Sequence, residues 1–104
     1  DTMPDKIFGF YGSDADAYQR HPVGLAPHLH NHSPCNQFKP WTIATLPLPF
    51  GGIEVYILWN TSRGELTTPI LNDITDRAQA IGLRPLTPIE LEDGSTRLNA
   101  GHHQ

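Results

Sequence analysis

The fold is decided by the stretch Ile53-Glu54-Val55-Tyr56-Ile57-Leu58-Trp59. β-Branched and aromatic side chains dominate it, which favours a β-strand. Successive side chains of a strand point to opposite faces of the sheet, and here both faces are largely apolar. A strand of this kind is typical of the centre of a sheet that is covered on both sides.

Two more strands are predicted before this central strand. Residues 41–46 (WTIATL) lead into it through the proline- and glycine-rich turn at residues 47–52. Residues 6–11 (KIFGFY) form an aromatic-rich strand near the start of the chain. Ser13 can cap a short helix over residues 14–20, because a serine hydroxyl accepts a hydrogen bond from the first helical turn.

A longer helix is predicted after the central strand. Thr68 is a suitable N-cap, and Pro69 stands at the first helical position, where a backbone N–H is not needed. Gly82 stands where a left-handed C-cap belongs. Asp73, Asp76 and Arg77 are expected to form the solvated face of this helix. The apolar residues form one stripe at helical spacing, namely Ile70, Leu71, Ile74, Ala78 and Ile81.

The last part of the chain is predicted to be a β-hairpin, since Asp93-Gly94 is a strong two-residue turn signal. Folding about this turn pairs Leu91 with Thr96 across the two strands. It also pairs Glu90 with Arg97 on the outer face, where opposite charges attract. Residues 99–104 are expected to form a flexible tail.

The predicted order is strand, short helix, long loop, strand, strand, helix, strand, strand. Without the last strand this is the βαββαβ order of the ferredoxin-like fold. We therefore expect a single α+β domain over residues 1–104, with the additional C-terminal strand completing the hairpin. Short open sheets of this kind often pair with one another, so a homodimer is expected.

Composition excludes several classes of function. The chain has 7 basic and 11 acidic residues, a net charge of −4, and no cluster of cations, so binding to nucleic acid is disfavoured. No apolar stretch approaches the ~20 residues of a membrane span, and no membrane association is expected. Cys35 is the single cysteine, which excludes an internal disulfide and favours a reducing, cytoplasmic location.

The segment of residues 21–40 has no periodicity and contains four prolines and four histidines. A long loop is expected here, and long loops in compact domains are usually functional or disordered. In an extended conformation His28, His30 and His32 would share one face and could bind a divalent metal, iron or zinc. Solvent-exposed histidines without a bound ion are the alternative.

Aromatic side chains suggest a second candidate site. The chain is rich in them for its size, and two or three could contact a flat ligand while the rest form the core. Tyr11, Tyr56 and Trp59 are the candidates for binding a small molecule, an aromatic one included.

Three segments resemble the DOPA extradiol dioxygenase family, whose members open catechol rings with a histidine-bound metal. Residues 21–28 (HPVGLAPH) look like the family's Pro-Val-Gly-Pro-His loop. Residues 52–61 (GIEVYILWNT) look like its hydrophobic strand leading into His-Pro-x-Thr. Residues 73–86 (DITDRAQAIGLRPL) look like its Asp-His-Thr helix and following strand. The resemblance implies a ferredoxin-like fold and carries over one metal ligand, His28.

The chain departs from that family at the other ligand positions. Residues 11–13 (YGS) stand where the family has His-x-His in its first strand. Trp59 and Ile74 fall at or near two further histidine positions. Any metal site would therefore have to be built almost alone by the loop of residues 21–40.

Three functions remain open from the sequence. The first is a small-molecule-binding protein of ferredoxin-like fold, divergent from the dioxygenases. The second is a metal-dependent enzyme, similar to a ring-cleaving dioxygenase, that uses the histidine-rich loop. The third is a partner-binding or structural protein in which residues 21–40 become ordered on the partner.

Overall fold

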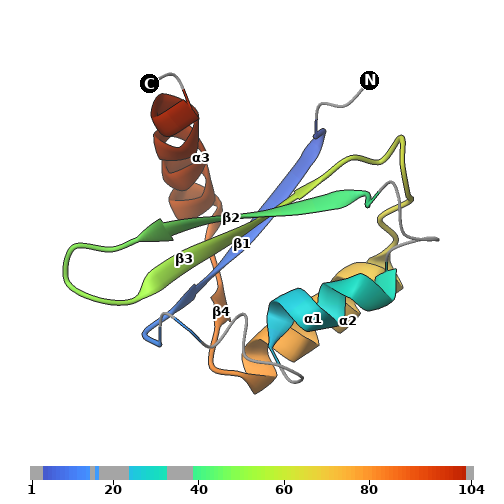
Figure 1. Ribbon diagram of the computed structural model, residues 1–104, viewed down its shortest axis with the longest axis horizontal. Coiled ribbons are helices and arrows are strands. Elements are labelled where there is room, and N and C mark those ends of the chain that lie inside the picture. Colours follow the sequence, from blue (N-terminus) through green and yellow to red (C-terminus); the bar gives the residue numbers. More distant parts are fainter. Residues whose placement is uncertain (1–3, 15, 17–23, 33–38, 103–104) are drawn as a thin grey trace.

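The computed structural model describes residues 4–14, 16, 24–32 and 39–102. They form a four-stranded antiparallel sheet with helices on both of its faces (Figure 1). The predicted α+β class is thus confirmed. The predicted helix at residues 14–20 lies mostly outside the described residues. No helix within the described ranges is long and apolar enough to cross a membrane.

The sheet has the strand order β2-β3-β1-β4. Three of its strands lie where the sequence predicts them: β1 (Lys6–Gly12), β2 (Trp41–Pro47) and β3 (Ile53–Trp59). The fourth, β4 (Arg84–Pro85), pairs with the end of β1. The sequence pattern predicts the fourth strand later, at the start of a C-terminal hairpin, and this position is wrong. β3 lies between two strands and is buried on both faces, as predicted for the central strand.

One face of the sheet carries the main core. In the antiparallel register Phe10 lies opposite Val55, and Ile43 lies opposite Ile57, all on this face. Helical residues pack onto them, and the core is completed by Leu25, Leu29, Trp41, Ile53, Trp59, Ile74, Ala78 and Leu83.

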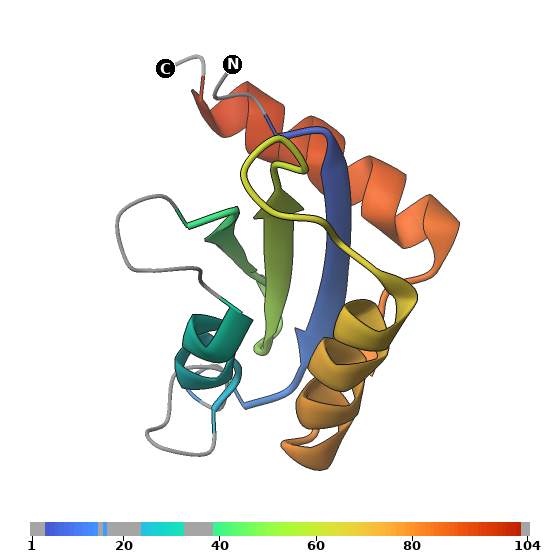
Figure 2. The ribbon, with the colours of Figure 1, turned by 90° about the vertical axis from the view of Figure 1, so that its right-hand side faces the viewer.

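Two helical segments cover this core face side by side, as Figure 2 shows. The first is α1 (Leu25–Leu29), which continues directly into a 3-10 turn, η2 (His30–His32). The second is α2 (Thr68–Ala80), which begins after the N-cap Thr67, one residue earlier than predicted.

The prediction that residues 21–40 form an aperiodic loop is therefore wrong for residues 25–32. Leu25 and Leu29 lie one helical turn apart and are fully buried, so burial of this pair favours a helix. Pro27 does not prevent it, because the N–H groups of a first helical turn have no partner within the helix.

The predicted C-terminal hairpin is also wrong: residues 88–102 form one helix, α3 (Pro88–His102). Its start is a capping box, in which the Glu90 N–H donates to Thr87 Oγ1 at 3.2 Å and the Thr87 N–H donates to Glu90 Oε1 at 2.9 Å. The helix also includes residues 99–102, which were expected to belong to a flexible tail. Two local signals compete here, the cap at Thr87 and the Asp93-Gly94 turn signal.

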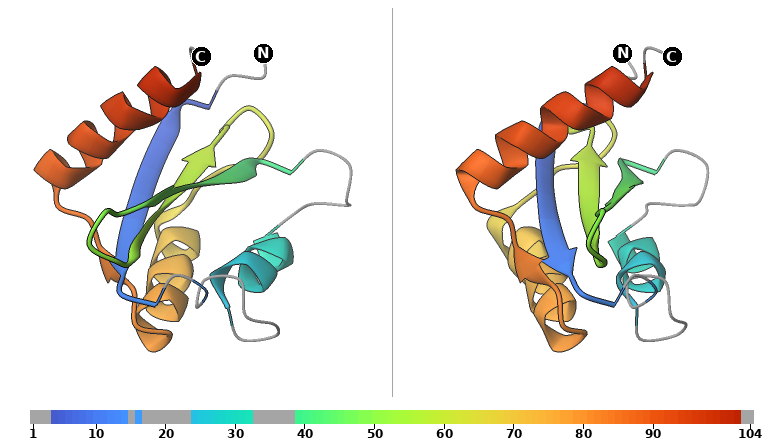
Figure 3. Two further views of the ribbon diagram at one scale, coloured as in Figure 1. Left: turned by 60° about the vertical axis from the view of Figure 1, so that its left-hand side comes forward. Right: turned by 90° about the vertical axis from the view of Figure 1, so that its left-hand side faces the viewer.

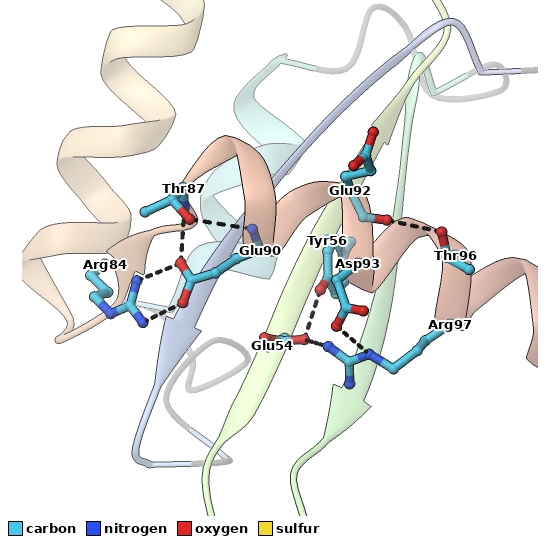
Figure 4. Close-up of polar contacts among 9 residues, drawn as sticks. All are labelled: Glu54, Tyr56, Arg84, Thr87, Glu90, Glu92, Asp93, Thr96 and Arg97. Atoms are coloured by element: carbon cyan, nitrogen blue, oxygen red, sulfur yellow. Dashed lines mark hydrogen bonds and ion pairs between the residues drawn. The ribbon is translucent and has the colours of Figure 1, made fainter.

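α3 crosses the second face of the sheet, opposite α1 and α2 (Figure 3). Gly94 is buried against the Tyr56 ring, and a Cβ built on Gly94 would lie only 1.5 Å from the Tyr56 hydroxyl oxygen. That hydroxyl donates to Glu54 Oε1 at 2.7 Å, and Arg97 Nη2 donates to the same oxygen at 2.8 Å (Figure 4). Glu54 is buried beneath α3 and therefore links β3 to this helix.

The cap of α3 should make stability depend on acid. Arg84 binds both carboxylate oxygens of Glu90 at 2.9 Å, and together with the backbone hydrogen bond from Thr87 it lowers the pKa of Glu90 from 4.5 to about 2. The Glu90 carboxylate therefore binds a proton more readily in the unfolded chain than in the folded protein. The stabilisation that ionised Glu90 gives to the folded state is present above pH 4.5 and is lost as the pH falls towards 2.

We expect Glu90→Gln to remove that part of the pH dependence, measured as the free energy of unfolding in urea between pH 2 and 5. Glu92→Gln is the matched control, because it removes the same charge from the same helix and leaves the Arg84–Glu90 pair intact. Equal pH profiles for Glu90→Gln and the wild type would contradict this account.

Candidate metal site

The helical conformation of residues 25–32 decides which histidines can act together. His28 and His32 are four residues apart and therefore lie on the same side of the helical segment. His30 points elsewhere. The prediction that His28, His30 and His32 share one face of an extended loop is thus wrong, because the segment is not extended.

Asp73 of α2 lies between the two histidines. Its Oδ2 atom is 2.8 Å from His28 Nε2 and 2.8 Å from His32 Nε2. One donor atom from each of the three residues lies within 4.8 Å of the other two, an arrangement that could hold a metal ion. Two helical segments that are distant in the sequence thus bring three ligand-type side chains to one point.

Two of the three residues of this triad are next in the sequence to a buried core residue. Leu29 follows His28, Ile74 follows Asp73, and both apolar side chains are fully buried in the core. The triad itself lies at the surface: the exposed fraction is 12% for the His28 side chain, 19% for His32 and 49% for Asp73. The backbone beside the triad is therefore anchored in the core, and the Asp73 carboxylate remains accessible from the solvent.

Hydrogen bonding favours the anionic form of Asp73. The hydrogen bonds to His32 and His28 hold the pKa of the Asp73 carboxyl below its ordinary value of 3.8. Asp73 is therefore an anion near neutral pH. The two imidazole rings are 5.8 Å apart and inclined at 72°, with both Nε2 atoms directed at the carboxylate.

His30 belongs to a different cluster. Its ring meets the edge of Trp41 at a centroid distance of 5.1 Å, and the Lys39 ammonium lies 4.8 Å from the centre of the Trp41 ring. His30 and Lys39 thus cover the buried Trp41 ring with polar groups. Cys35 lies outside the described residues.

The three aromatic residues predicted to bind a small molecule do not share one face of the sheet. Trp59 is 1% exposed within the main core, and its indole N–H donates to the Gly64 carbonyl at 2.7 Å. Tyr56 lies on the opposite face, fully buried beneath α3. Tyr11 is half-buried, with the Arg84 guanidinium 5.1 Å from the centre of its ring. The structure thus does not bring the three together at one point.

The metal ligands implied by the dioxygenase resemblance do not fit this chain. Trp59 and Ile74 stand at or near two of the histidine positions, and both are buried in the core. His28 is the one ligand that the resemblance implies. Its partners here, His32 and Asp73, form a different ligand set.

Sequence reasoning missed Asp73, which was assigned to the solvated face of its helix. A usable signal was present: the four-residue spacing of His28 and His32 repeats that of Leu25 and Leu29, which predicts a helix with two aligned imidazoles. The contact with Asp73 spans 45 residues from His28, and no local pattern encodes it.

Comparison of the chain with known protein families, with curated proteins and with solved structures finds no match.

Proposed function

We propose that this protein binds one divalent transition-metal ion through His28, His32 and Asp73 and uses the ion to bind and transform a small oxygen-containing molecule. The observation that carries the proposal is the convergence of two imidazole Nε2 atoms on one carboxylate oxygen, each at 2.8 Å. A metal-dependent enzyme is the function that this arrangement supports best.

The donor set matches a known class of metal site. Two histidines and one carboxylate, with the other coordination positions open, are typical of non-haem iron(II) oxygenases, and zinc accepts the same donors. A bound ion would act as a Lewis acid on an oxygen atom of the substrate. The protein residues would hold the ion by three bonds and leave its outer side accessible.

A purely structural reading of the triad explains the geometry less well. One hydrogen bond from either histidine to Asp73 would join α1 and α2, whose contact is already stabilised by the buried Leu25 and Leu29. A second imidazole on the same oxygen adds little to that connection. A site for one ion, by contrast, needs several donor atoms that converge, and one donor atom of each residue lies within 4.8 Å of the other two.

The fold supports a related inference about ancestry. The strand order β2-β3-β1-β4, with helical segments after β1 and after β3 on one face, agrees with a ferredoxin-like arrangement extended by α3. We infer a ferredoxin-like domain that diverged from the DOPA extradiol dioxygenases and rebuilt its metal site around His28. The small molecule whose binding the sequence predicts would then bind at the open coordination positions of the ion.

Metal titration tests the proposal. We expect tag-free protein, purified without nickel, to bind about one equivalent of Co²⁺ or Zn²⁺ in isothermal titration calorimetry. His28→Ala and His32→Ala should each lose this binding. His30→Ala is the matched control, because His30 contacts Trp41 in place of Asp73 and its removal should leave the affinity unchanged.

Two results would overturn the proposal. One is the absence of stoichiometric binding by the wild-type protein. The other is an equal loss of affinity in all three alanine variants, which would indicate loose binding by surface histidines.

A further inference from the structure

We propose that two copies of this protein pair through the outer edge of β2, so that their two four-stranded sheets join into one. β2 stands at one end of the strand order β2-β3-β1-β4, and among the described strands β3 is its one neighbour (Figure 3). This edge is a surface apart from the triad of His28, His32 and Asp73, and the inference does not depend on the metal.

The hydrogen bonds between β2 and β3 show which backbone groups of β2 face outwards. The Asn60 N–H donates to the Pro40 carbonyl at 2.6 Å, directly before β2 begins. The Leu48 N–H donates to the Gly52 carbonyl at 3.2 Å, directly after β2 ends. Hydrogen-bonded and non-hydrogen-bonded pairs alternate along an antiparallel ladder, so the even-numbered residues of β2 bond to β3. The N–H and C=O groups of the odd-numbered residues are therefore directed away from the sheet.

Ile43 and Thr45 present these outward groups at the middle of the edge. Within the part of the chain that the structure describes, no backbone group bonds to the outer side of either residue. Native proteins usually protect such an edge with charged side chains, proline, a bulge or a short strand, because it is a template for another strand. β2 has seven residues in unbroken register and no charged side chain, and its proline, Pro47, stands at the very end. The edge is therefore suited to pairing.

The edge also fits a second copy of itself. Antiparallel pairing about a two-fold axis at Ala44 gives every residue of β2 a partner in the other copy, with residue 41 opposite residue 47. Ile43 would lie opposite the partner's Thr45, and each of the two would donate one hydrogen bond to the other and accept one. The two Ala44 side chains would meet in a closely spaced, non-hydrogen-bonded pair, where a small side chain permits the approach.

Charge favours a second copy as the occupant of this edge. The chain has a net charge of −4, but β2 carries no charge, so the paired strands would meet without repulsion between them. An extended segment of another protein would need no such neutrality and could use a charged edge.

The turn after β2 supplies apolar surface for the same interface. Phe50 in this turn is 100% exposed, and the two-fold pairing places the turn near the start of the partner's β2. Two phenylalanine side chains supply about 300–500 Å² of surface for burial. Stable interfaces bury about 1,200–2,000 Å² in total, so the paired strands must supply most of the rest. A reversible dimer, present at micromolar or higher concentration, is expected.

Sedimentation velocity over about 1 μM to 1 mM protein measures the association, with a chelator present so that shared metal ions cannot cause it. We expect the wild type to change from monomer to dimer within this range. Thr45→Pro removes an outward N–H that β3 does not use, and it should weaken the dimer at least about tenfold. Thr45→Val is the matched control, because it keeps the N–H group and the branched side chain and should dimerise like the wild type.

A second pair of variants tests the turn without risk to the fold. Phe50→Ala should also weaken the dimer at least about tenfold, since the exposed ring has no role in the monomer core. Ile89→Ala is its control: Ile89 is 81% exposed, begins α3 beside β4 at the opposite edge of the sheet, and should leave the association unchanged.

Two results would overturn the proposal. One is a wild-type protein that stays monomeric over the whole concentration range, which would leave the edge to an extended segment of another protein. The other is a dimer that Phe50→Ala and Thr45→Pro form as readily as the wild type, which would place the interface elsewhere. If Thr45→Pro fails to fold, the comparison of Phe50→Ala with Ile89→Ala decides.

Discussion

Replacing Gly94 with alanine is expected to destabilise the protein by about 2 kcal/mol or more, although the same change stabilises an ordinary helix interior by about 1 kcal/mol. The added Cβ would lie 1.5 Å from the Tyr56 hydroxyl oxygen and 2.3 Å from the ring carbon that bears it. Tyr56 is fully buried and hydrogen-bonded to Glu54, so we expect α3 to move away from the sheet. That movement would also weaken the contact between Arg97 and Glu54.

Urea unfolding of the Gly94→Ala variant measures this effect. Asn99→Ala is the matched control, because Asn99 is exposed on the same helix and the change should be neutral or slightly stabilising. A Gly94→Ala variant as stable as the wild type would show that α3 does not pack closely on β3.

The second large effect is expected for Asp73→Asn in the presence of metal. An ion that binds only the folded chain stabilises it by about 2.7 kcal/mol when its free concentration is 100 times the Kd. For a domain of this size that corresponds to a rise in Tm of roughly 10–20 °C. Asp73→Asn removes the one anionic ligand and should abolish most of this rise.

Differential scanning calorimetry with and without Zn²⁺ measures the change in Tm. Asp76→Asn is the matched control: Asp76 is exposed on the same helix, its removal changes the net charge equally, and the triad stays intact. A rise in Tm of the same size in both variants would mean that the ion binds elsewhere.

The sheet could largely be predicted from the sequence, because its three long strands carry their own signals. β3 is apolar on both faces, and the structure places it between two strands with helices above and below. β4 could not be found in this way, since two residues, Arg84 and Pro85, are too few to show an alternating pattern.

The helix α3 could have been predicted, but two signals within it disagreed. Thr87-Pro88-Ile89-Glu90 has the spacing of a capping box, and Asp93-Gly94 has the composition of a hairpin turn. The tertiary structure decides between them, because Gly94 serves as the contact point with Tyr56 and is not the corner of a turn. Contacts between distant segments are not encoded in local composition.

The candidate site was predicted only in part. The sequence identifies His28 and His32 as metal-ligand residue types, but it groups them with His30 because an extended loop was expected. The buried pair Leu25 and Leu29 makes the segment helical and so separates His30 from the other two. Asp73 joins them only once α1 and α2 are packed on the same sheet.

The joining of α1–η2 to α2 also has a consequence for the lifetime of the folded state. His32 and Asp73 are 41 residues apart, and the hairpin of β2 and β3 lies between them. An ion bound to both would close this part of the chain into a ring. The segment α1–η2 could then separate from α2 only after the ion had dissociated. Bound metal would therefore slow unfolding as well as raise the free energy of unfolding.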